Sequence, residues 1–350
     1  MYCAQRVFRL CKWLERLGDR LTGAAGPVFV SLAIVLLSTG TISFFDVIAP
    51  SLPWPWLSIP ACLLIATNMF AHYYYVCTIS PGFVADGPHT PGTGLLWAKK
   101  RKTARIRQLT GVRWSDDVSV TKASVTKCRR CAEMRPESPS LPDMQPLCIE
   151  IRSPLSRVNQ CVGLYNERYF VLFLVYLVIA TFCFSALGWP HVMAALGWHD
   201  DPWPYRSPQI MFLLTYILAA VLCFAVTIMT GWHLWSIASG ETSVEAHDHD
   251  HYRRMAKRRG DDFVNSYDLG KMKNLELFFN VGMDGYPLYT LALPLRAEPY
   301  TDGRSWARKK GLERHHGIPL HYRQLCLSVS LGCVSLVGLW SVMALLWSTM

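Results

Sequence analysis

Four long apolar blocks constrain this chain more than any other feature of its sequence. They cover residues 27–47, 56–79, 169–189 and 208–232. Each block is close to the ~20 residues that an α-helix needs to cross a hydrocarbon core of ~30 Å. The sequence therefore predicts an α-helical multi-pass membrane protein with four transmembrane helices.

The two ends of the chain leave alternatives open. The first block follows 26 residues that carry five arginines and lysines, and no small-residue cleavage site ends it, so a retained helix is favoured over a removable signal peptide. A fifth apolar block, residues 325–347, is long enough to span but richer in serine, glycine and cysteine. It is read either as a fifth helix or as the product of translation out of frame.

Positive charge is distributed unevenly around the four blocks. Of the 35 lysines and arginines, only Arg206 falls in a predicted lumenal loop. The positive-inside rule then places the N-terminus (1–26), the central loop (80–168) and the C-terminal region (233–324) in the cytosol. The net charge of +10 needs no nucleic acid to explain it. The basic runs 99–102 and 253–259 suit an anionic leaflet, and a solvated loop is the alternative for the first.

The twelve cysteines do not form a disulfide framework. Cys62, Cys77, Cys183 and Cys223 fall inside predicted spans, and most of the others face a reducing cytosol. Metal or thiol chemistry is the better interpretation.

Two groups of residues are candidates for metal binding. Cys128 and Cys131 have the CxxC spacing that grips one tetrahedral zinc, but alone they make half a site, and an incidental pair is the alternative. Histidines 247, 249 and 251 alternate with two aspartates. A solvated linker explains this second group better than a metal site.

The predicted spans contain few ionisable residues, namely Asp46 and His72 near helix ends. Transporters usually place charged relays at membrane depth, and many are built from internal repeats. The sequence shows no such repeat, which disfavours a carrier or channel. The polar cytosolic segments are expected to carry the function.

Short motifs in these cytosolic segments occur in an informative order. They are Ser80-Pro81-Gly82, Asn159-Gln160-Cys161-Val162-Gly163, Asn166-Glu167-Arg168-Tyr169-Phe170, Thr242-Ser243-Val244-Glu245, and Tyr267 to Gly270 followed by Asn274 and Phe278-Phe279-Asn280. Together with the spans, they resemble the aspartate-histidine-histidine-cysteine (DHHC) protein palmitoyltransferases over about residues 27–300. The degenerate cysteine-rich domain covers about residues 126–168.

This resemblance implies a protein-cysteine S-palmitoyltransferase of the endoplasmic reticulum or Golgi. A cysteine thiolate takes palmitoyl from palmitoyl-coenzyme A and passes it to a cytosolic cysteine of a membrane-associated protein. Two structural zinc ions hold the cysteine-rich loop, and the helices house the acyl chain in the bilayer. In this chain Cys128 and Cys131 are remnants of one zinc site and Cys161 of the other.

The catalytic run of the family is missing from the sequence. Counting back from Cys161 places Leu155 at the nucleophile, with Arg152, Ser153 and Pro154 where the aspartate and two histidines belong. Leucine cannot attack a thioester, so no catalytic residue is intact and the chain as written is predicted to be inactive.

The genetic code suggests why the run is missing. Codons for residues 139–157, read one base out of frame, can spell His-His-Cys-x2-Cys-x2-Cys and then Asp-His-His-Cys-Pro. At the Met144/Gln145 boundary the triplet must be TGC, a cysteine codon. We interpret the segment as out of frame through a sequencing slip, a misplaced intron boundary or a frameshifted allele. The alternative is a diverged pseudoenzyme that acts as a membrane scaffold.

Overall fold

The computed structural model describes most of the helical part of the chain. The described residues are 26–82, 92, 94, 96–99, 118–122, 125–127, 134–136, 162–197, 203–241, 253–254, 257–258, 264–265, 267–282, 285–301 and 305–309. Several predicted features lie outside them: Cys128, Cys131, residues 152–155, Cys161, the 242–245 motif, the histidines at 247–251 and the block 325–347.

The described elements are mainly helices. They are a first helical segment, Gly26–Ser51, which ends in a π-helical turn (η1, Phe44–Ile48) and a 3-10 turn (η2, Ala49–Ser51), then α2 (Pro55–Thr78), α3 (Glu167–Ala195), α4 (Gln209–Ser239), α6 (Lys271–Phe278) and α7 (Tyr289–Ala292). The strands are β1 (Val118–Lys122), β2 (Val125–Lys127), β3 (Met134–Pro136) and β4 (Ser305–Lys309).

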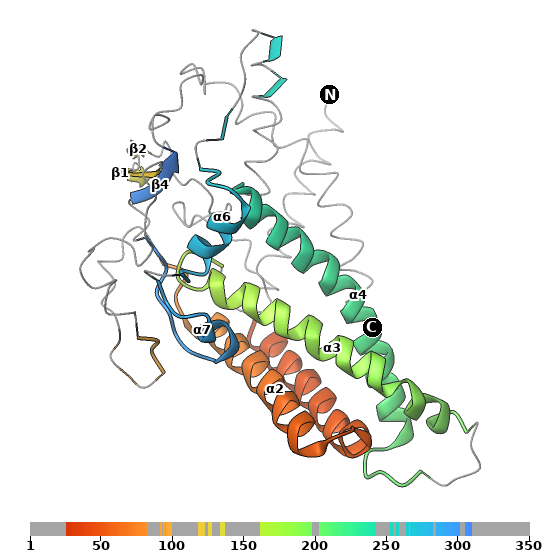
Figure 1. Ribbon diagram of the computed structural model, residues 1–350. Helices are drawn as coiled ribbons and strands as arrows, with labels where there is room; N and C mark the ends of the chain where they lie inside the picture. Colours follow the sequence, from red (N-terminus) through yellow and green to blue (C-terminus); the bar gives the residue numbers. More distant parts are fainter. Residues whose placement is uncertain are drawn as a thin grey trace, which may run out of the picture.

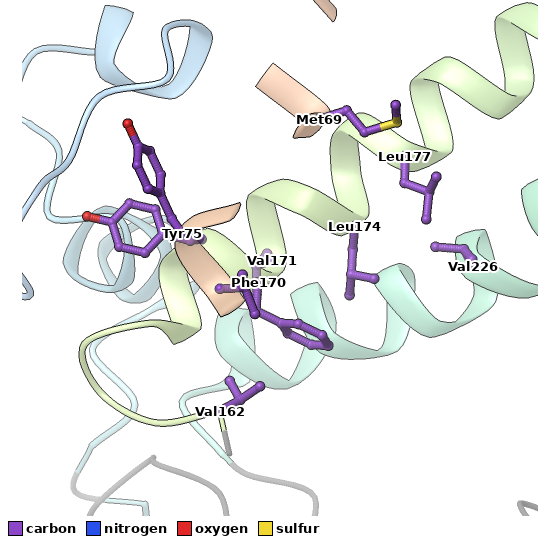
Figure 2. Packing of buried hydrophobic residues seen from close by; sticks show 10 residues of the cluster. Met69, Tyr75, Val162, Phe170, Val171, Leu174, Leu177 and Val226 are labelled. Atoms are coloured by element: carbon purple, nitrogen blue, oxygen red, sulfur yellow. The ribbon is translucent and has the colours of Figure 1, made fainter. Parts of the chain in front are cut away.

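The long helices form one bundle in which α3 packs against both α2 and α4, with the first helical segment also against α3 (Figure 1). Apolar side chains fill the bundle in two clusters. One cluster lies near the start of α3, where Phe170, Leu174 and Leu177 meet α2 and α4 (Figure 2). The other lies at the opposite end, around Ile48 and Phe212.

Local sequence explains where the helices begin and end. α2 begins at Pro55, a residue favoured in the first turn because its nitrogen has no proton to leave unpaired. It ends at Thr78, and the extended Ile79 leads to Pro81. α4 ends at Gly240, whose φ of 62° is the left-handed conformation that commonly terminates helices.

Three helices in the described part of the chain are long and apolar enough to cross a membrane: Gly26–Ser51, Glu167–Ala195 and Gln209–Ser239. Many of their large apolar side chains, such as Phe182 and Phe224, are exposed. In water this would be unfavourable, so the chain is an α-helical membrane protein. The predicted helix at residues 56–79 forms as α2, but it is not among these three. The count of four spans therefore stays a prediction.

Three helices are longer than the apolar blocks predict. The first helical segment ends at Ser51 instead of at Val47. α3 continues through Pro190 to Ala195 instead of stopping at Trp189, and α4 continues beyond Trp232 to Ser239. Proline removes only one backbone donor near the helix end, and the remaining turn is still closed by the bond from Leu196 N to Val192 O. Hydropathy marks where a helix leaves the lipid, whereas the helix itself continues to its cap.

The region at one end of the bundle contains α6 and the strands (Figure 1). α6 packs against the end of α4. β1 pairs antiparallel with β4, and this pairing joins the central loop to the C-terminal region. β2 pairs with β3 as a separate hairpin. Segments far apart in sequence therefore meet on the side that positive charge assigns to the cytosol.

Candidate functional site

The Ser80-Pro81-Gly82 motif lies directly against the end of the cysteine-rich segment. Asn166 joins the two: its Nδ2 donates to the Ile79 carbonyl at 3.2 Å, and its Oδ1 accepts from Gly163 N at 2.7 Å. The Pro81 carbonyl also accepts from Tyr165 N at 3.4 Å. The residues that follow α2 thus fix the position where the chain enters α3.

Two glycines allow this close approach. A Cβ on Gly163 would lie 2.6 Å from the Pro81 carbonyl oxygen. A Cβ on Gly82, whose φ is 87°, would clash with the Tyr165 ring. Both separations are shorter than van der Waals contact, so the junction between α2 and α3 requires glycine at both positions.

We expect Gly163→Ala to destabilise the protein. The added methyl must displace the Pro81 backbone, and such overpacking costs about 1–3 kcal/mol. Thermal unfolding of detergent-solubilised protein measures the effect. Gly231→Ala is the matched control, because nothing lies within 4 Å of its Cβ position in α4 and alanine is favoured in helices. Equal unfolding midpoints for the two variants would contradict the assigned contact.

Asn274 holds together the end of α4 and the start of α6. Its Nδ2 donates to the Ala238 carbonyl in the last turn of α4 at 2.9 Å and to Asp268 Oδ1 at 3.0 Å, and its Oδ1 accepts from Leu269 N at 3.0 Å. Asn265 Nδ2 adds a bond to the Gly240 carbonyl at 3.1 Å. These bonds fix the direction in which the chain leaves α4, just before the Thr242-Ser243-Val244-Glu245 motif.

Arg168 connects the start of α3 with the C-terminal region, and the sequence analysis did not single it out. Its side chain is buried; Nη1 donates to the Phe279 carbonyl at 2.7 Å, and Nη2 donates to Thr290 Oγ1 at 3.1 Å. A second contact of Nη2 reaches the Thr290 carbonyl at 3.4 Å. An arginine at the start of an apolar span could have indicated this connection from the sequence. Burying its charge without hydrogen-bond partners is costly, so a buried arginine is expected to bind polar groups of another segment.

Tyr286 lies beside this arginine, whose guanidinium is 6.0 Å from the ring centroid. Burial raises the pKa of Tyr286 to about 12, so its hydroxyl stays protonated at neutral pH. The hydroxyl oxygen accepts from Glu298 N at 3.3 Å. The surroundings of Arg168 are therefore uncharged carbonyl, hydroxyl and ring groups.

An apolar cavity of about 110 Å³ lies among the first helical segment, α2, α3 and α4, and is open to the surroundings. Its walls include Leu36, Phe44, Met69, Leu177 and Phe184. Because its walls are almost entirely apolar, the cavity suits a hydrocarbon chain rather than a polar ligand.

The structure brings together some of the predicted site residues. Ser80, Pro81 and Gly82 meet Gly163 and Asn166, and Asn274 fixes the end of α4. Among the described residues no group of three or more His, Cys, Asp or Glu could hold a metal. The predicted ligands Cys128, Cys131 and Cys161 are not among those residues, so the zinc prediction is untested.

Comparison with known proteins agrees with the motif order. A family model described as DHHC palmitoyltransferase matches residues 156–250. Palmitoyltransferase ZDHHC16 of Mus musculus is 26% identical, over 86% of this chain and 78% of that protein. The protein of the same name from Homo sapiens is 24% identical, over 86% and 79%. A probable protein S-acyltransferase 14 of Arabidopsis thaliana is 26% identical, over 80% and 86%.

The limits of the family match are informative. It begins at residue 156, immediately after Leu155, and runs through Asn166, Arg168, α3 and α4 to residue 250. The Thr242-Ser243-Val244-Glu245 motif is inside the match, whereas residues 152–155, which the sequence predicts to occupy the catalytic positions, are outside it. The match begins beside Arg157, near which the reading frame is predicted to return.

Proposed function

We propose that this chain, which belongs to the DHHC palmitoyltransferase family, is a protein S-acyltransferase whose catalytic segment is absent from the sequence as it stands. The restored protein transfers palmitoyl from palmitoyl-coenzyme A to cytosolic cysteines of membrane-associated proteins. Its relatives are named palmitoyltransferases and S-acyltransferases over most of this chain's length. The chain as written carries out no acyl transfer.

The observation that carries this proposal is the boundary of the family match at residue 156. A protein that had drifted gradually from its family would be expected to lose similarity in many places. Here the surrounding scaffold keeps specific contacts, such as Asn166 to Ile79 and Asn274 to Ala238. The segment whose codons can spell the catalytic motif out of frame lies immediately before the match.

The scaffold suits the proposed reaction. The apolar cavity among the helices is available to an acyl chain, and its walls include Met69 of α2 and Leu177 of α3 in the middle of the bundle. The junction of Pro81 with Gly163 positions the chain two residues after Cys161. A cysteine nucleophile held in that segment would reach a thioester at the membrane surface, where coenzyme A remains in water.

Zinc does not fit the residues that remain. DHHC palmitoyltransferases bind zinc in general, and a structural zinc site takes four ligands in a tetrahedron. The three cysteines at positions 128, 131 and 161 cannot complete two such sites. The two structural sites are proposed only for the restored protein.

The membrane arrangement belongs to the same proposal. α2 would be the fourth span, since its 24 residues reach ~36 Å at 1.5 Å per residue and it packs along α3. Both termini and the junction would then face the cytosol. The endoplasmic reticulum or Golgi is the proposed location.

A scaffold without catalysis is the second candidate, and Leu155 favours it because leucine cannot act as a nucleophile. The nucleotide sequence separates the two candidates. We expect verified complementary DNA to encode, between residues 137 and 158, His-His-Cys-x2-Cys-x2-Cys and Asp-His-His-Cys-Pro-Trp. Codons that give no histidines or cysteines out of frame would instead establish the scaffold. Acyl transfer by the corrected chain is the direct test of the activity.

A further inference from the structure

The segment 286–298 lies alongside α2 and α3 rather than beyond their ends (Figure 1). Asn68 shows how far it reaches. Its Nδ2 donates to the Leu64 carbonyl of its own helix and to the Ala292 carbonyl, each at 2.9 Å. The Ala292 carbonyl is therefore level with the middle part of α2, roughly 15 Å from the end of that helix at Thr78 and roughly 20 Å from its start at Pro55.

Hydrogen bonds from tyrosines on α2 and α3 place the segment along the same path. Tyr176 OH donates to the Leu291 carbonyl at 2.7 Å, whereas Tyr169, nearer the start of α3, bonds Ala297. On α2, Tyr75 OH donates to the Pro294 carbonyl at 2.9 Å. Tyr75 is seven residues, about two helical turns, closer than Asn68 to the end of α2 at Thr78. Both helices thus show the segment rising from mid-bundle at residues 291–292 to the cytosolic junction at residue 297.

The pattern of these bonds is the one that hydrocarbon surroundings require. A non-helical backbone at membrane depth has no water to satisfy its carbonyls, so protein groups must do so. Four side chains, from Asn68, Tyr75, Tyr169 and Tyr176, bond backbone groups of the segment. In a loop surrounded by water such dedicated donors would be unnecessary.

The outward face of the same segment is apolar. Leu288 is 69% exposed and Leu293 is 40% exposed, with Tyr289 exposed between them. At the corresponding level of α2, Leu63 and Leu64 are exposed as well. The outer face of the segment therefore continues the apolar outer surface of a membrane helix.

We propose that residues 286–297 form a re-entrant element that enters the cytosolic leaflet, with Leu288, Tyr289 and Leu293 against lipid acyl chains. Its partner is the hydrocarbon of the bilayer, and the donors on α2 and α3 hold its backbone. The proposal goes beyond the proposed function: it needs the helices to cross a bilayer, but it requires no acyl transfer. It holds equally for an active enzyme and for a scaffold.

Fluorescence quenching tests this placement in the full chain reconstituted in phosphatidylcholine vesicles. An environment-sensitive fluorescent amino acid replaces Leu293 or, separately, Leu288. The matched control is Leu96, an exposed leucine whose carbonyl accepts from Arg296 N at 2.7 Å at the cytosolic end of the segment. We expect nitroxide-labelled lipid to quench positions 293 and 288 several-fold more than position 96, and aqueous iodide to show the opposite order.

Either of two results would overturn the proposal. If iodide quenches positions 293 and 288 as strongly as position 96, the segment faces water. If neither quencher reaches positions 293 and 288, another part of the protein covers them. A thermal unfolding midpoint equal to that of the unlabelled protein shows that a labelled chain is folded. None of these measurements depends on enzymatic activity, so their failure is distinguishable from failure of the proposed function.

Discussion

The chain as written is expected to form no hydroxylamine-sensitive acyl group when it is incubated with a palmitoyl-coenzyme A analogue. The frame-corrected chain is expected to become labelled and to transfer the acyl group onward. The physical reason is Leu155, which has no nucleophilic atom and which the spacing from Cys161 predicts to occupy the position of the reactive thiol. Removing a catalytic nucleophile typically lowers the rate by about 10⁶-fold in enzymes where this has been measured. The difference between the two chains should therefore be close to all or none.

The controls for this experiment separate catalysis from folding. Replacing the restored nucleophile by alanine should abolish labelling while leaving the thermal unfolding midpoint of the corrected chain unchanged. Robust labelling of the uncorrected chain that survives Cys148→Ala and Cys161→Ala would show that another residue performs the chemistry. An unlabelled corrected chain that is folded and holds two zinc ions would favour the scaffold.

Replacing Arg168 by methionine should have the largest effect on stability of any single change outside the catalytic segment. The substitution keeps an apolar stem but removes the donors to the Phe279 carbonyl and to Thr290. Each charge-assisted hydrogen bond contributes about 1.5–3 kcal/mol, and the carbonyl left behind is buried. Part of this loss is offset, because the guanidinium no longer has to be desolvated.

Arg206→Met is the matched control for this variant, since Arg206 is exposed in the link between α3 and α4. Its effect should remain within about 0.5 kcal/mol. We expect Arg168→Met to lower the thermal unfolding midpoint clearly and to increase protease cleavage between residues 279 and 301. Arg168→Lys should be intermediate, because lysine keeps the charge but not the two-pronged geometry. Equal midpoints for the methionine variants would show that the Arg168 bonds add no net stability.

The helical architecture was predictable because the physical signal is local. Crossing a bilayer requires about 20 apolar residues in succession, and such blocks are visible without any tertiary information. The predicted blocks correspond to the helices Gly26–Ser51, α2, α3 and α4. Their ends were less predictable, because caps such as Gly240 and the bonds beyond Pro190 decide where a helix stops.

The candidate site was only partly predictable. Motif order identified Ser80-Pro81-Gly82 and Asn274, but not their partners, because the Pro81–Gly163 and Asn274–Ala238 contacts join residues distant in sequence. Arg168 was present in a quoted motif and yet carried no role. Its bonds to Phe279 and Thr290 depend on how the C-terminal region folds back on α3.

The sequence by itself determined that the chain is a membrane protein and which family it resembles, because hydropathy and motif order are properties of the linear chain. Codon constraints are also properties of the linear chain, and the absence of the catalytic residues stays a prediction from them. Only the tertiary structure decided that the residues after α2 meet the start of α3, and that segment 286–298 runs alongside the helices. Carbonyls such as that of Ala292 accept a bond from a helix far away in sequence. No local sequence pattern predicts such a hydrogen-bond partner, because only the packing of the helices brings the donor and the acceptor together.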